Sequence, residues 1–289
     1  MTLKELKAHF TNSLSDLYPS EEIQSFFTIL SENYLQLSRI EIALNPAKEI
    51  SLETKTIFQK ALLQLLNNEP IQYILGETEF YGLPFKVNKH TLIPRPETEE
   101  LVEWILSEVK NIQGIEGEFN ILDIGTGSGC IAISLAKNLP TSIVSAIDFS
   151  KEALKVACQN ANDNQVEVHF FQADILKTAQ LPKQYDLIVS NPPYVREMEK
   201  KMMQQNVLKY EPDSALFVSD ADPLLFYRVI SQLAKKHLKP NGNLFFEINE
   251  YLSEELRVFL KEEGFQNIEV KKDIFRKNRM IKCNLHERP

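Results

Sequence analysis

The sequence predicts an α/β protein in which a small all-α bundle precedes a mostly parallel sheet covered by helices on both faces. Two observations lead to this fold class. Residues 1–75 carry apolar side chains at three- and four-residue spacing and contain no glycine, which is typical of packed helices. From residue 93 onward, β-branched strand segments alternate with amphipathic helical segments, and parallel strands need helix-length connections of that kind.

Length and composition exclude several classes of protein. The 289 residues are 43% hydrophobic and 25% charged, which argues against disorder and suffices for one large core or two smaller ones. No apolar run approaches the ~18 residues that span a bilayer, and the N-terminus lacks a signal segment, so we expect a cytoplasmic protein without membrane contact. The net charge of -8 disfavours nucleic acid as a partner. The three cysteines and five histidines are too scattered for a metal site or a disulfide framework.

The first 75 residues are expected to form a helical domain. An apolar helical period runs from Leu3 to Leu17, and a second runs from Ser20 to Leu37. Ser51 is the predicted N-cap of a further helix that ends at the Asn- and Pro-containing residues 67–70. A small bundle set apart from a sheet suggests a module that docks a partner.

The rest of the chain divides into a linker and a main domain. Residues 76–92 are predicted to be a β-hairpin linker, because aromatic and β-branched residues surround Gly82 and Pro84. The main domain, residues 93–289, should begin with a helix at Pro96. Its last two strands are too close in sequence for a helix to join them, so they should form an antiparallel hairpin at the sheet edge. The predicted strands are residues 120–124, 143–148, 166–172, 186–190, 243–248, 268–272 and 280–284, and the helices between them include residues 131–138, 151–160, 223–237 and 253–263.

The strongest local motif is a glycine-rich turn between a predicted strand and a predicted helix. Gly125, Gly127 and Gly129 follow Asp123 in a G-x-G-x-G spacing, and glycine there lets a ligand approach the backbone closely. The spacing matches neither the dinucleotide fingerprint nor a phosphate loop. An acid beside the loop suits an ammonium group better than a diphosphate, and Asp148 at the end of the next strand can accept two ribose hydroxyls. These features favour S-adenosylmethionine as the ligand; the alternative is a merely tight turn.

A second motif, Asn191-Pro192-Pro193-Tyr194, directly follows the predicted strand 186–190. Ligands bind beyond the carboxyl ends of the strands in an open α/β sheet, so this motif is expected beside the glycine loop. The Asn191 side-chain oxygen and the Pro192 carbonyl can each accept one N–H bond from a planar NH2 group. Such bonds would hold a weakly nucleophilic nitrogen for attack, and Tyr194 offers a flat face for packing. The alternative is a rigid turn that caps the strand.

Together with further segments, these motifs resemble a known family. Residues 123–129 (Asp-Ile-Gly-Thr-Gly-Ser-Gly), Asp148 and residues 191–194 are similar to the motifs of class I S-adenosylmethionine-dependent methyltransferases. The resemblance extends over nearly the whole chain. It narrows to the peptide-chain release factor glutamine methyltransferases (the HemK/PrmC family) through residues 69–76 (Glu-Pro-Ile-Gln-Tyr-Ile-Leu-Gly), residues 92–99 (Leu-Ile-Pro-Arg-Pro-Glu-Thr-Glu) and Glu211-Pro212.

The resemblance implies a Rossmann-like class I methyltransferase sheet in residues 93–289 and a substrate-docking role for residues 1–75. It implies S-adenosyl-L-methionine as cofactor and S-adenosyl-L-homocysteine as product. The implied partners are class 1 peptide-chain release factors, methylated on the side-chain amide nitrogen (N5) of the glutamine in their Gly-Gly-Gln motif, and the enzyme is expected to be a monomer. The residues expected to hold the cofactor are Asp123, Gly125, Thr126, Gly127, Ser128, Gly129, Asp148, Phe149, Asp174, Ile175 and Asn191. Those expected at the substrate are Asn191, Pro192, Pro193, Tyr194, Arg95 and Glu97, of which Asn191, Pro192 and Tyr194 are the catalytic ones.

Several residues leave alternatives open. Ile175 stands where some relatives have an aromatic residue, so it offers adenine only aliphatic packing, and residues 213–222 lack the glycines of many relatives. Arg95 and Glu97 can equally be residues that cap and solvate a helix N-terminus. Cys130 is expected to pack behind the glycine loop rather than act as a nucleophile. The basic side chains of the terminal hairpin form either a solvated face or a contact with nucleic acid or the ribosome: Lys271, Lys272, Arg276, Lys277, Arg279 and Lys282.

Three other functions fit parts of the pattern. N6-adenine methylation of DNA or RNA is compatible with residues 191–194, although the net charge and the lack of a basic recognition domain oppose it. Methylation of a glutamine in a ribosomal protein would use the same chemistry. A cofactor-binding scaffold without catalysis would be expected to have lost a motif residue, whereas Asp148, Asn191 and Tyr194 are all present.

Overall fold

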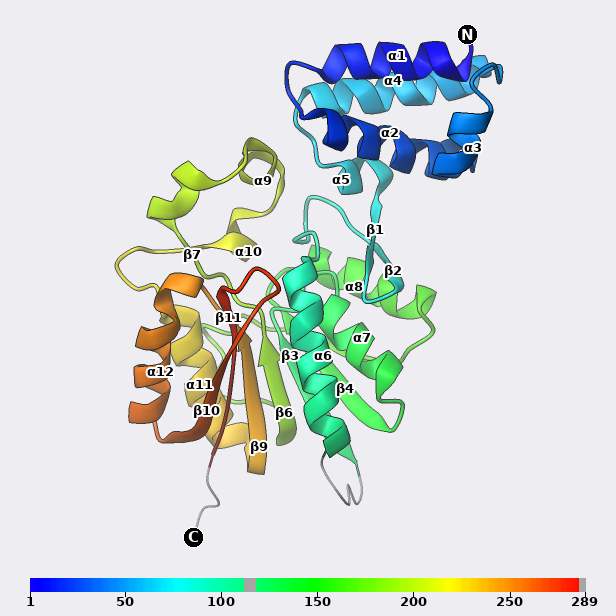
Figure 1. The fold of residues 1–289 in the computed structure, drawn as a ribbon. Helices are drawn as coiled ribbons and strands as arrows, with labels where there is room; N and C mark the ends of the chain where they lie inside the picture. The colour runs from blue at the N-terminus through cyan, green and yellow to red at the C-terminus, as the bar shows by residue number, and fades with distance from the viewer. Residues whose placement is uncertain (112–117, 286–289) are drawn as a thin grey trace. The chain divides into compact units, whose positions relative to one another are not determined.

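The computed structural model describes residues 1–111 and 118–285, and Figure 1 labels their helices and strands. The described residues form two compact units. The first is Met1–Gly76 together with Gln204–Tyr210, and the second is the described part of Glu77–Met203 and Glu211–Pro289. The insertion Gln204–Tyr210, which the sequence analysis included in residues 93–289, therefore clusters with the helical unit.

The first unit is a helical bundle with an aromatic core. Phe10, Phe27 and Phe58 are buried in it, with the Phe27 ring centroid 5.6 Å from that of Phe10 and 5.7 Å from that of Phe58. The Tyr210 hydroxyl donates to the Asn67 carbonyl oxygen over 2.9 Å, which ties the inserted helix to the bundle. The helices are α1 (Leu3–Leu14), α2 (Ser20–Leu35), α3 (Arg39–Leu44), α4 (Leu52–Leu66), α5 (Ile71–Leu75) and α9 (Gln205–Tyr210).

The helical prediction for this part is confirmed, but the first two helices end before the predicted periods do. The first period was expected to run to Leu17, whereas α1 ends at Leu14. The second period was expected to continue to Leu37, but α2 ends at Leu35 because Gln36 takes a left-handed conformation with φ of 54°. Ser38 then caps α3. Ser51 caps α4 as predicted, its hydroxyl accepting the Thr54 amide over 3.1 Å.

The second unit is built on a seven-stranded sheet. Its strands are β3 (Phe119–Ile124), β4 (Ser142–Asp148), β5 (His169–Gln172), β6 (Tyr185–Ser190), β9 (Leu238–Glu247), β10 (Phe265–Lys272) and β11 (Asn278–Leu285). They lie in the order β10-β11-β9-β6-β3-β4-β5. The five strands from β9 to β5 pair in parallel, and β11 pairs antiparallel with both β9 and β10. The parallel sheet and its antiparallel edge hairpin are thus confirmed.

Three strands begin three or more residues from the predicted position, and one of them is β10, which begins at Phe265 rather than at residue 268. β5 begins at His169 rather than at residue 166, because the Val166 amide still bonds the Ala161 carbonyl at the end of the preceding helix. β9 begins at Leu238, but its ladder with β6 is irregular until Asn243, the predicted first residue.

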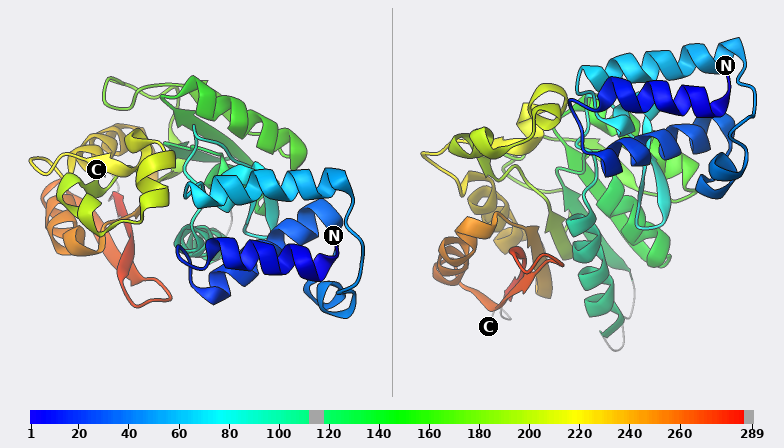
Figure 2. Two further views of the ribbon diagram at one scale, coloured as in Figure 1. Left: turned by 90° about the horizontal axis from the view of Figure 1, so that it is seen from above. Right: turned by 45° about the horizontal axis from the view of Figure 1, so that its top comes forward.

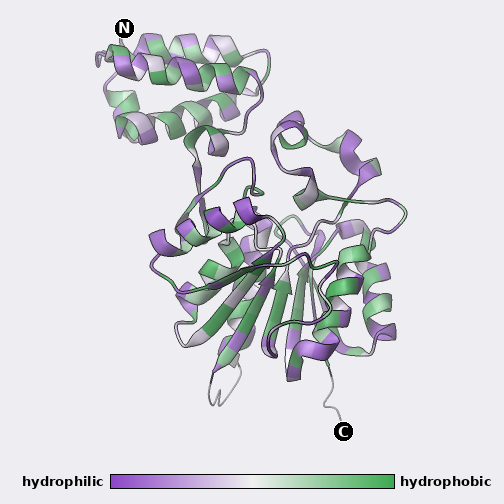
Figure 3. Cartoon of the chain, turned by 180° about the vertical axis from the view of Figure 1, so that it is seen from behind, coloured by the Kyte–Doolittle hydropathy of each residue, from purple (hydrophilic) through white to green (hydrophobic). Residues whose placement is uncertain are grey.

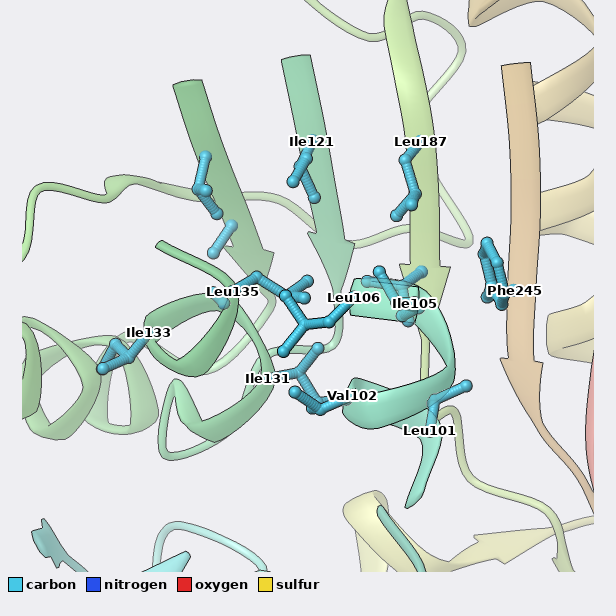
Figure 4. Close-up of a cluster of buried hydrophobic side chains, with 14 of the residues drawn as sticks. Leu101, Val102, Ile105, Leu106, Ile121, Ile131, Ile133, Leu135, Leu187 and Phe245 are labelled. Carbon is cyan, nitrogen blue, oxygen red and sulfur yellow. The ribbon is translucent and has the colours of Figure 1, made fainter. Parts of the chain in front are cut away.

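Helices cover both faces of this sheet (Figures 1 and 2). α6 (Pro96–Asn111), α7 (Cys130–Asn138) and α8 (Lys151–Asp163) lie on one face, and α11 (Leu225–His237) and α12 (Ser253–Glu262) lie on the other. Successive strand residues alternate between the two layers. Figure 4 shows the first layer, where side chains of α6 and α7 meet those of the strands. Figure 3 shows the hydrophobic strands between helices of mixed polarity.

Shorter elements complete the second unit. β1 (Glu77–Phe80) and β2 (Leu83–Lys86) form the predicted hairpin, whose two turn residues have positive φ, as a tight two-residue turn requires. After β6, β7 (Val195–Arg196) pairs in parallel with β8 (Phe217–Val218). η1 (Glu197–Met202) and α10 (Asp213–Leu216) lie between them in sequence, so the segment whose shape was left open is a short helix followed by a strand. Within residues 1–111 and 118–285, no helix is long and apolar enough to cross a membrane.

Candidate active site

Most of the predicted site residues line one cavity of about 520 Å³ in the second unit. The cavity lies at the carboxyl ends of β3, β4 and β6, where ligands bind in open α/β sheets. Its size is in the range of small-molecule and cofactor sites. The predicted residues in its wall are Gly125, Thr126, Gly127, Ser128, Asp148, Phe149, Asp174, Ile175, Asn191, Pro192, Pro193 and Arg95.

The three glycines of the loop have different surroundings. All three have positive φ, between 56° and 84°. A Cβ atom at Gly125 or Gly127 would meet no protein atom within 4 Å, and both residues line the cavity. A Cβ at Gly129 would lie 2.8 Å from Ile133 Cδ1 and 3.2 Å from Ala157 Cβ. The first two glycines therefore leave room for a ligand, whereas Gly129 allows α7 to pack closely against α8 and is not part of the described cavity wall.

Asp123 lies beneath this loop rather than in the cavity wall. It is fully buried, and its Oδ2 accepts the Thr126 hydroxyl over 2.6 Å. Among residues 1–111 and 118–285, no donor meets hydrogen-bond geometry at Oδ1, although the Ala132 amide is near enough to lower the pKa. Burial outweighs these contacts and raises the pKa of Asp123 to about 7. The structure thus places Asp123 as the group that holds Thr126 and the loop.

Asp148 lies in the cavity wall at the end of β4. Its Oδ2 accepts the Gly127 amide over 2.9 Å and its Oδ1 accepts the Ser150 amide over 2.8 Å. Each carboxylate oxygen has a second lone pair, so both oxygens can still accept a hydroxyl from the cavity. Burial raises the pKa of this carboxyl, against the opposing effect of the two amides. The pKa of Asp174 is shifted in the opposite direction, because a hydrogen bond from Lys177 lowers it.

The side chains of the 191–194 motif join a buried polar cluster. Asn191 Nδ2 donates to Thr98 Oγ1 over 3.3 Å, and the Thr98 hydroxyl donates to Glu247 Oε2 over 2.6 Å. The Tyr194 hydroxyl donates to Glu247 Oε1 over 2.9 Å. Tyr194 is not part of the described cavity wall, so its ring packs against the sheet and its predicted flat face is not offered to the cavity.

Burial sets the electrostatics of this cluster. Glu247 is 1% exposed and Thr98 is 2% exposed. Burial raises the pKa of Glu247, while the hydroxyls of Thr98 and Tyr194 and the positive charge of Arg279 act to lower it. The pKa of Tyr194 lies well above its ordinary value, chiefly through burial and secondly through the nearby Glu247 charge. The Tyr194 hydroxyl is therefore a donor and not a base.

Sequence reasoning missed Thr98 and Glu247 as site residues. A signal for Glu247 exists, because it is the single acid in the otherwise apolar run 244–248. Thr98 stands among acidic residues at the start of a helix and has no comparable local signal. Further missed residues form the apolar part of the cavity wall, where nothing in the sequence separates them from ordinary core residues: Leu92, Pro94, Phe217, Phe226 and Ile230.

Arg95 and Glu97, predicted together, are separated by the structure. Arg95 lines the cavity, and its Nη2 lies 2.6 Å from Glu211 Oε1. The other oxygen of Glu211 accepts the Ile93 amide over 3.1 Å. Glu211 is buried, so it holds the segment before α6 against the segment before α10. Glu97 is not part of the described cavity wall, and its negative charge acts on Glu247.

Three of the six basic side chains of the terminal hairpin make ion pairs. Lys277 contacts Glu250, and Lys282 contacts both Glu108 and Glu269. Arg279 is largely buried and contacts Asp273 over 3.2 Å.

Cys130 lines the cavity, and burial raises the pKa of its thiol to about 12, so it is a neutral wall residue. Among the residues that the structure describes, no three His, Cys, Asp or Glu side chains come together as ligands of a metal would.

Comparison with known proteins gives the family of this chain. Residues 5–76 match the PrmC N-terminal domain, and residues 104–214 match the methyltransferase small domain. The release factor glutamine methyltransferase of Flavobacterium psychrophilum is 51% identical over 284 residues, covering 98% of this chain and 99% of that protein. The protein of the same name from Bacteroides thetaiotaomicron is 41% identical over 283 residues, covering 98% of this chain and all of that protein.

A solved structure agrees on the fold alone. A methyltransferase from Pyrococcus furiosus matches with a TM-score of 0.52 at 17% identity, covering 79% of this chain and all of that chain. The cavity at the strand ends, the geometry of the glycine loop and the two sequence relatives all agree with one family assignment. The chain belongs to the release factor glutamine methyltransferase family.

Proposed function

We propose that this protein transfers a methyl group from S-adenosyl-L-methionine to the side-chain amide nitrogen (N5) of the glutamine in the Gly-Gly-Gln motif of class 1 peptide-chain release factors. One observation carries this proposal. In a chain of this family, the Asn191 amide and Pro192 lie in the wall of the same cavity as the glycine loop and Asp148. That arrangement sets acceptors for a planar amide NH2 beside a nucleoside site.

The cavity wall fits the cofactor. The space left beside Gly125 and Gly127 would be filled by any side chain at either position, which is what close approach of a ligand to this backbone requires. We propose that Asp148 accepts the ribose hydroxyls and that Phe149, Asp174 and Ile175, which line the same cavity, lie along the adenine. The bound cofactor supplies an electrophilic methyl group on a sulfonium centre. Since Asp123 is buried beneath the loop, its proposed part is to hold Thr126 in place.

The substrate half of the cavity is proposed to act by positioning. Asn191 Oδ1 and the Pro192 carbonyl accept the two hydrogens of the glutamine NH2 group, which fixes the nitrogen in front of the methyl group. Acceptors on both N–H bonds also stabilise the positive charge that develops on this nitrogen. Arg95, held by Glu211, borders the same space and can donate to the main chain of the substrate loop.

The experiment that tests this function is transfer of labelled methyl from S-adenosyl-L-methionine to a purified class 1 release factor. The matched control is the same factor with its Gly-Gly-Gln glutamine replaced by alanine. We expect label in the intact factor and none in the control. Label in both factors, or in neither, would contradict the proposal; labelling of ribosomal protein or of DNA instead would assign one of the alternative substrates.

The helical unit is proposed to dock the release factor, with residues 1–75 as the docking domain, residues 76–92 as its linker and residues 93–289, apart from the insertion Gln204–Tyr210, as the catalytic domain. Supporting this role, α3 and α4 expose large apolar side chains, including Leu44 at 74% and Leu52 at 79%, which is typical of interaction surfaces when such residues cluster. The double variant Leu44→Glu, Leu52→Glu should raise KM for the release factor while the cofactor Kd stays unchanged. An unchanged KM would remove this pair from the docking surface.

A further inference from the structure

The end of β9 holds the 191–194 motif at two points. Glu247, the last residue of β9, receives hydrogen bonds from Thr98 over 2.6 Å and from Tyr194 over 2.9 Å. Asn249, two residues later, donates from Nδ2 to the Tyr194 carbonyl oxygen over 3.0 Å. The motif is therefore attached to a strand that is more than fifty residues away in sequence.

With Glu247 ionised, the directions of the hydrogen bonds in this cluster are fixed. An ionised carboxylate only accepts hydrogen bonds, so the single hydroxyl proton of Thr98 must lie between Thr98 and Glu247. Thr98 Oγ1 can then only accept a further hydrogen bond. The atom of Asn191 that faces it, 3.3 Å away, must be the donating Nδ2. Asn191 Oδ1 is then left for a ligand.

Two hydroxyls and a guanidinium act against the effect of burial on the Glu247 carboxyl. The groups that face it are the hydroxyls of Thr98 and Tyr194, the guanidinium of Arg279, the carboxylate of Glu97 and the nearby thiol of Cys130. Burial and Glu97 favour the neutral acid, whereas two hydroxyl donors and Arg279 favour the carboxylate. Arg279 is itself fixed by Asp273 and by the Ile248 carbonyl oxygen. A carboxylate with two donors and a positive neighbour is the state for which the hydrogen-bond directions above hold.

We propose that Glu247 and Thr98 are positioning residues that set the orientation of the Asn191 side-chain amide, so that Asn191 presents its oxygen rather than its NH2 group to the substrate nitrogen. This inference rests on the proposed function, because the direction matters for a substrate that donates N–H bonds. An Asn191 amide turned by 180° would place two donors against the substrate NH2 group, which repels it. Thr98 also lines the cavity, but its proposed effect on turnover, like that of Glu247, is exerted through Asn191.

Substitutions at Thr98 test this directly. Thr98→Val keeps the shape and removes the hydroxyl, and it should lower kcat roughly 10- to 100-fold, the size usual for losing a group that orients a residue in direct contact. Thr98→Ser restores the hydroxyl and should recover most of the turnover. The amide introduced by Glu247→Gln can donate as well as accept, so it no longer fixes the direction of the Thr98 hydroxyl proton. This variant should lower kcat about 10-fold or more. The Kd of S-adenosyl-L-methionine should stay unchanged in all three.

Tyr227→Phe is the matched control. The Tyr227 hydroxyl is equally buried and donates to the main-chain carbonyl oxygen of Glu247 over 3.1 Å, but it lies outside the chain of bonds to Asn191. Like Thr98→Val, Tyr227→Phe removes one hydroxyl that bonds to Glu247. Its kcat should nevertheless equal that of the wild type. An equal loss of kcat in Tyr227→Phe and Thr98→Val would show a merely structural effect and overturn the inference.

A variant pair shows whether Thr98 acts through Asn191. In an Asn191→Ala background, Thr98→Val should cause no further loss of kcat, because the side chain that it orients is gone. Losses that multiply in the double variant would overturn the inference.

The orientation can also be observed without any turnover. In a spectrum of 15N-labelled protein, the Asn191 side-chain NH2 signal, identified by its loss in Asn191→Ala, should shift in Thr98→Val and return in Thr98→Ser. A signal that does not respond to Thr98→Val contradicts the inference. Wild-type protein that transfers no methyl to a release factor would instead contradict the proposed function, and the NH2 signal would still decide the orientation.

Discussion

The two sides of the cavity are held in place in different ways. On the glycine-loop side, Thr126 bonds Asp123 three residues before it, and the amides of Gly125 and Thr126 both donate to the Ile147 carbonyl of the neighbouring strand. On the opposite side, Asn191 is oriented by Thr98 of α6, and Thr98 is in turn held by Glu247. The first side depends on a contact three residues apart and on main-chain bonds between adjacent strands, and the second depends on side chains from separate segments.

The largest expected effect is on the side that depends on the fold. Asn191→Ala removes the acceptor that is proposed to hold the substrate nitrogen, so kcat should fall on the order of 10²–10³-fold, while the Kd of S-adenosyl-L-methionine measured by calorimetry stays the same. Unchanged turnover would show that this side does not position the substrate.

Within the glycine loop, Gly129→Ala should lower the stability of the fold and leave cofactor binding unchanged. Its methyl group would lie 2.8 Å from Ile133 Cδ1 in a residue with φ of 84°, so strain and overpacking should lower the free energy of unfolding by roughly 2–4 kcal/mol. Denaturant unfolding measures this loss. A stable variant with weakened cofactor binding would instead place Gly129 in direct contact with the ligand.

Gly127→Ala should mainly weaken cofactor binding and should affect stability less. Its methyl group meets no protein atom within 4 Å and projects into the cavity. The Kd of S-adenosyl-L-methionine should therefore rise about 10- to 100-fold, equivalent to ~1.4–2.8 kcal/mol, with only the ~1–2 kcal/mol cost of a left-handed alanine in the free energy of unfolding. Cofactor affinity equal to that of the wild type would mean that the ligand does not approach this backbone.

The smallest effect concerns the pH dependence of the loop. The pKa of Asp123 is raised to about 7 by burial, against about 3.9 in an unfolded chain. Between these values the folded state holds a proton that the unfolded state has lost, so this carboxyl makes the folded state less stable as the pH rises from about 4 to about 7. The difference in unfolding free energy, Asp123→Asn minus wild type, should therefore rise over this range and level off above it. A difference that is flat with pH would show that Asp123 is ionised throughout.

Much of the fold could be predicted because its signals are periodic. The helical spacing in residues 1–75 and the alternation of strands and helices after residue 93 are repeated over many residues, so single exceptions do not hide them. The misses occur where one residue decides the conformation. Gln36 ends α2 by adopting a left-handed conformation that its type does not signal, and α9 joins the helical unit through tertiary contacts of its own.

The same distinction between sequence signals and tertiary contacts applies to the site. The glycine loop and the 191–194 motif could be recognised by sequence alone, because close approach of a ligand and a rigid turn require particular residue types at fixed spacing. Which glycine faces the ligand, which one packs against α8 and which way the Asn191 amide is turned depend on atoms contributed by α6, α8 and β9. Only the tertiary structure decided these points, because hydrogen-bond direction and steric contact are set by partners that are distant in the chain.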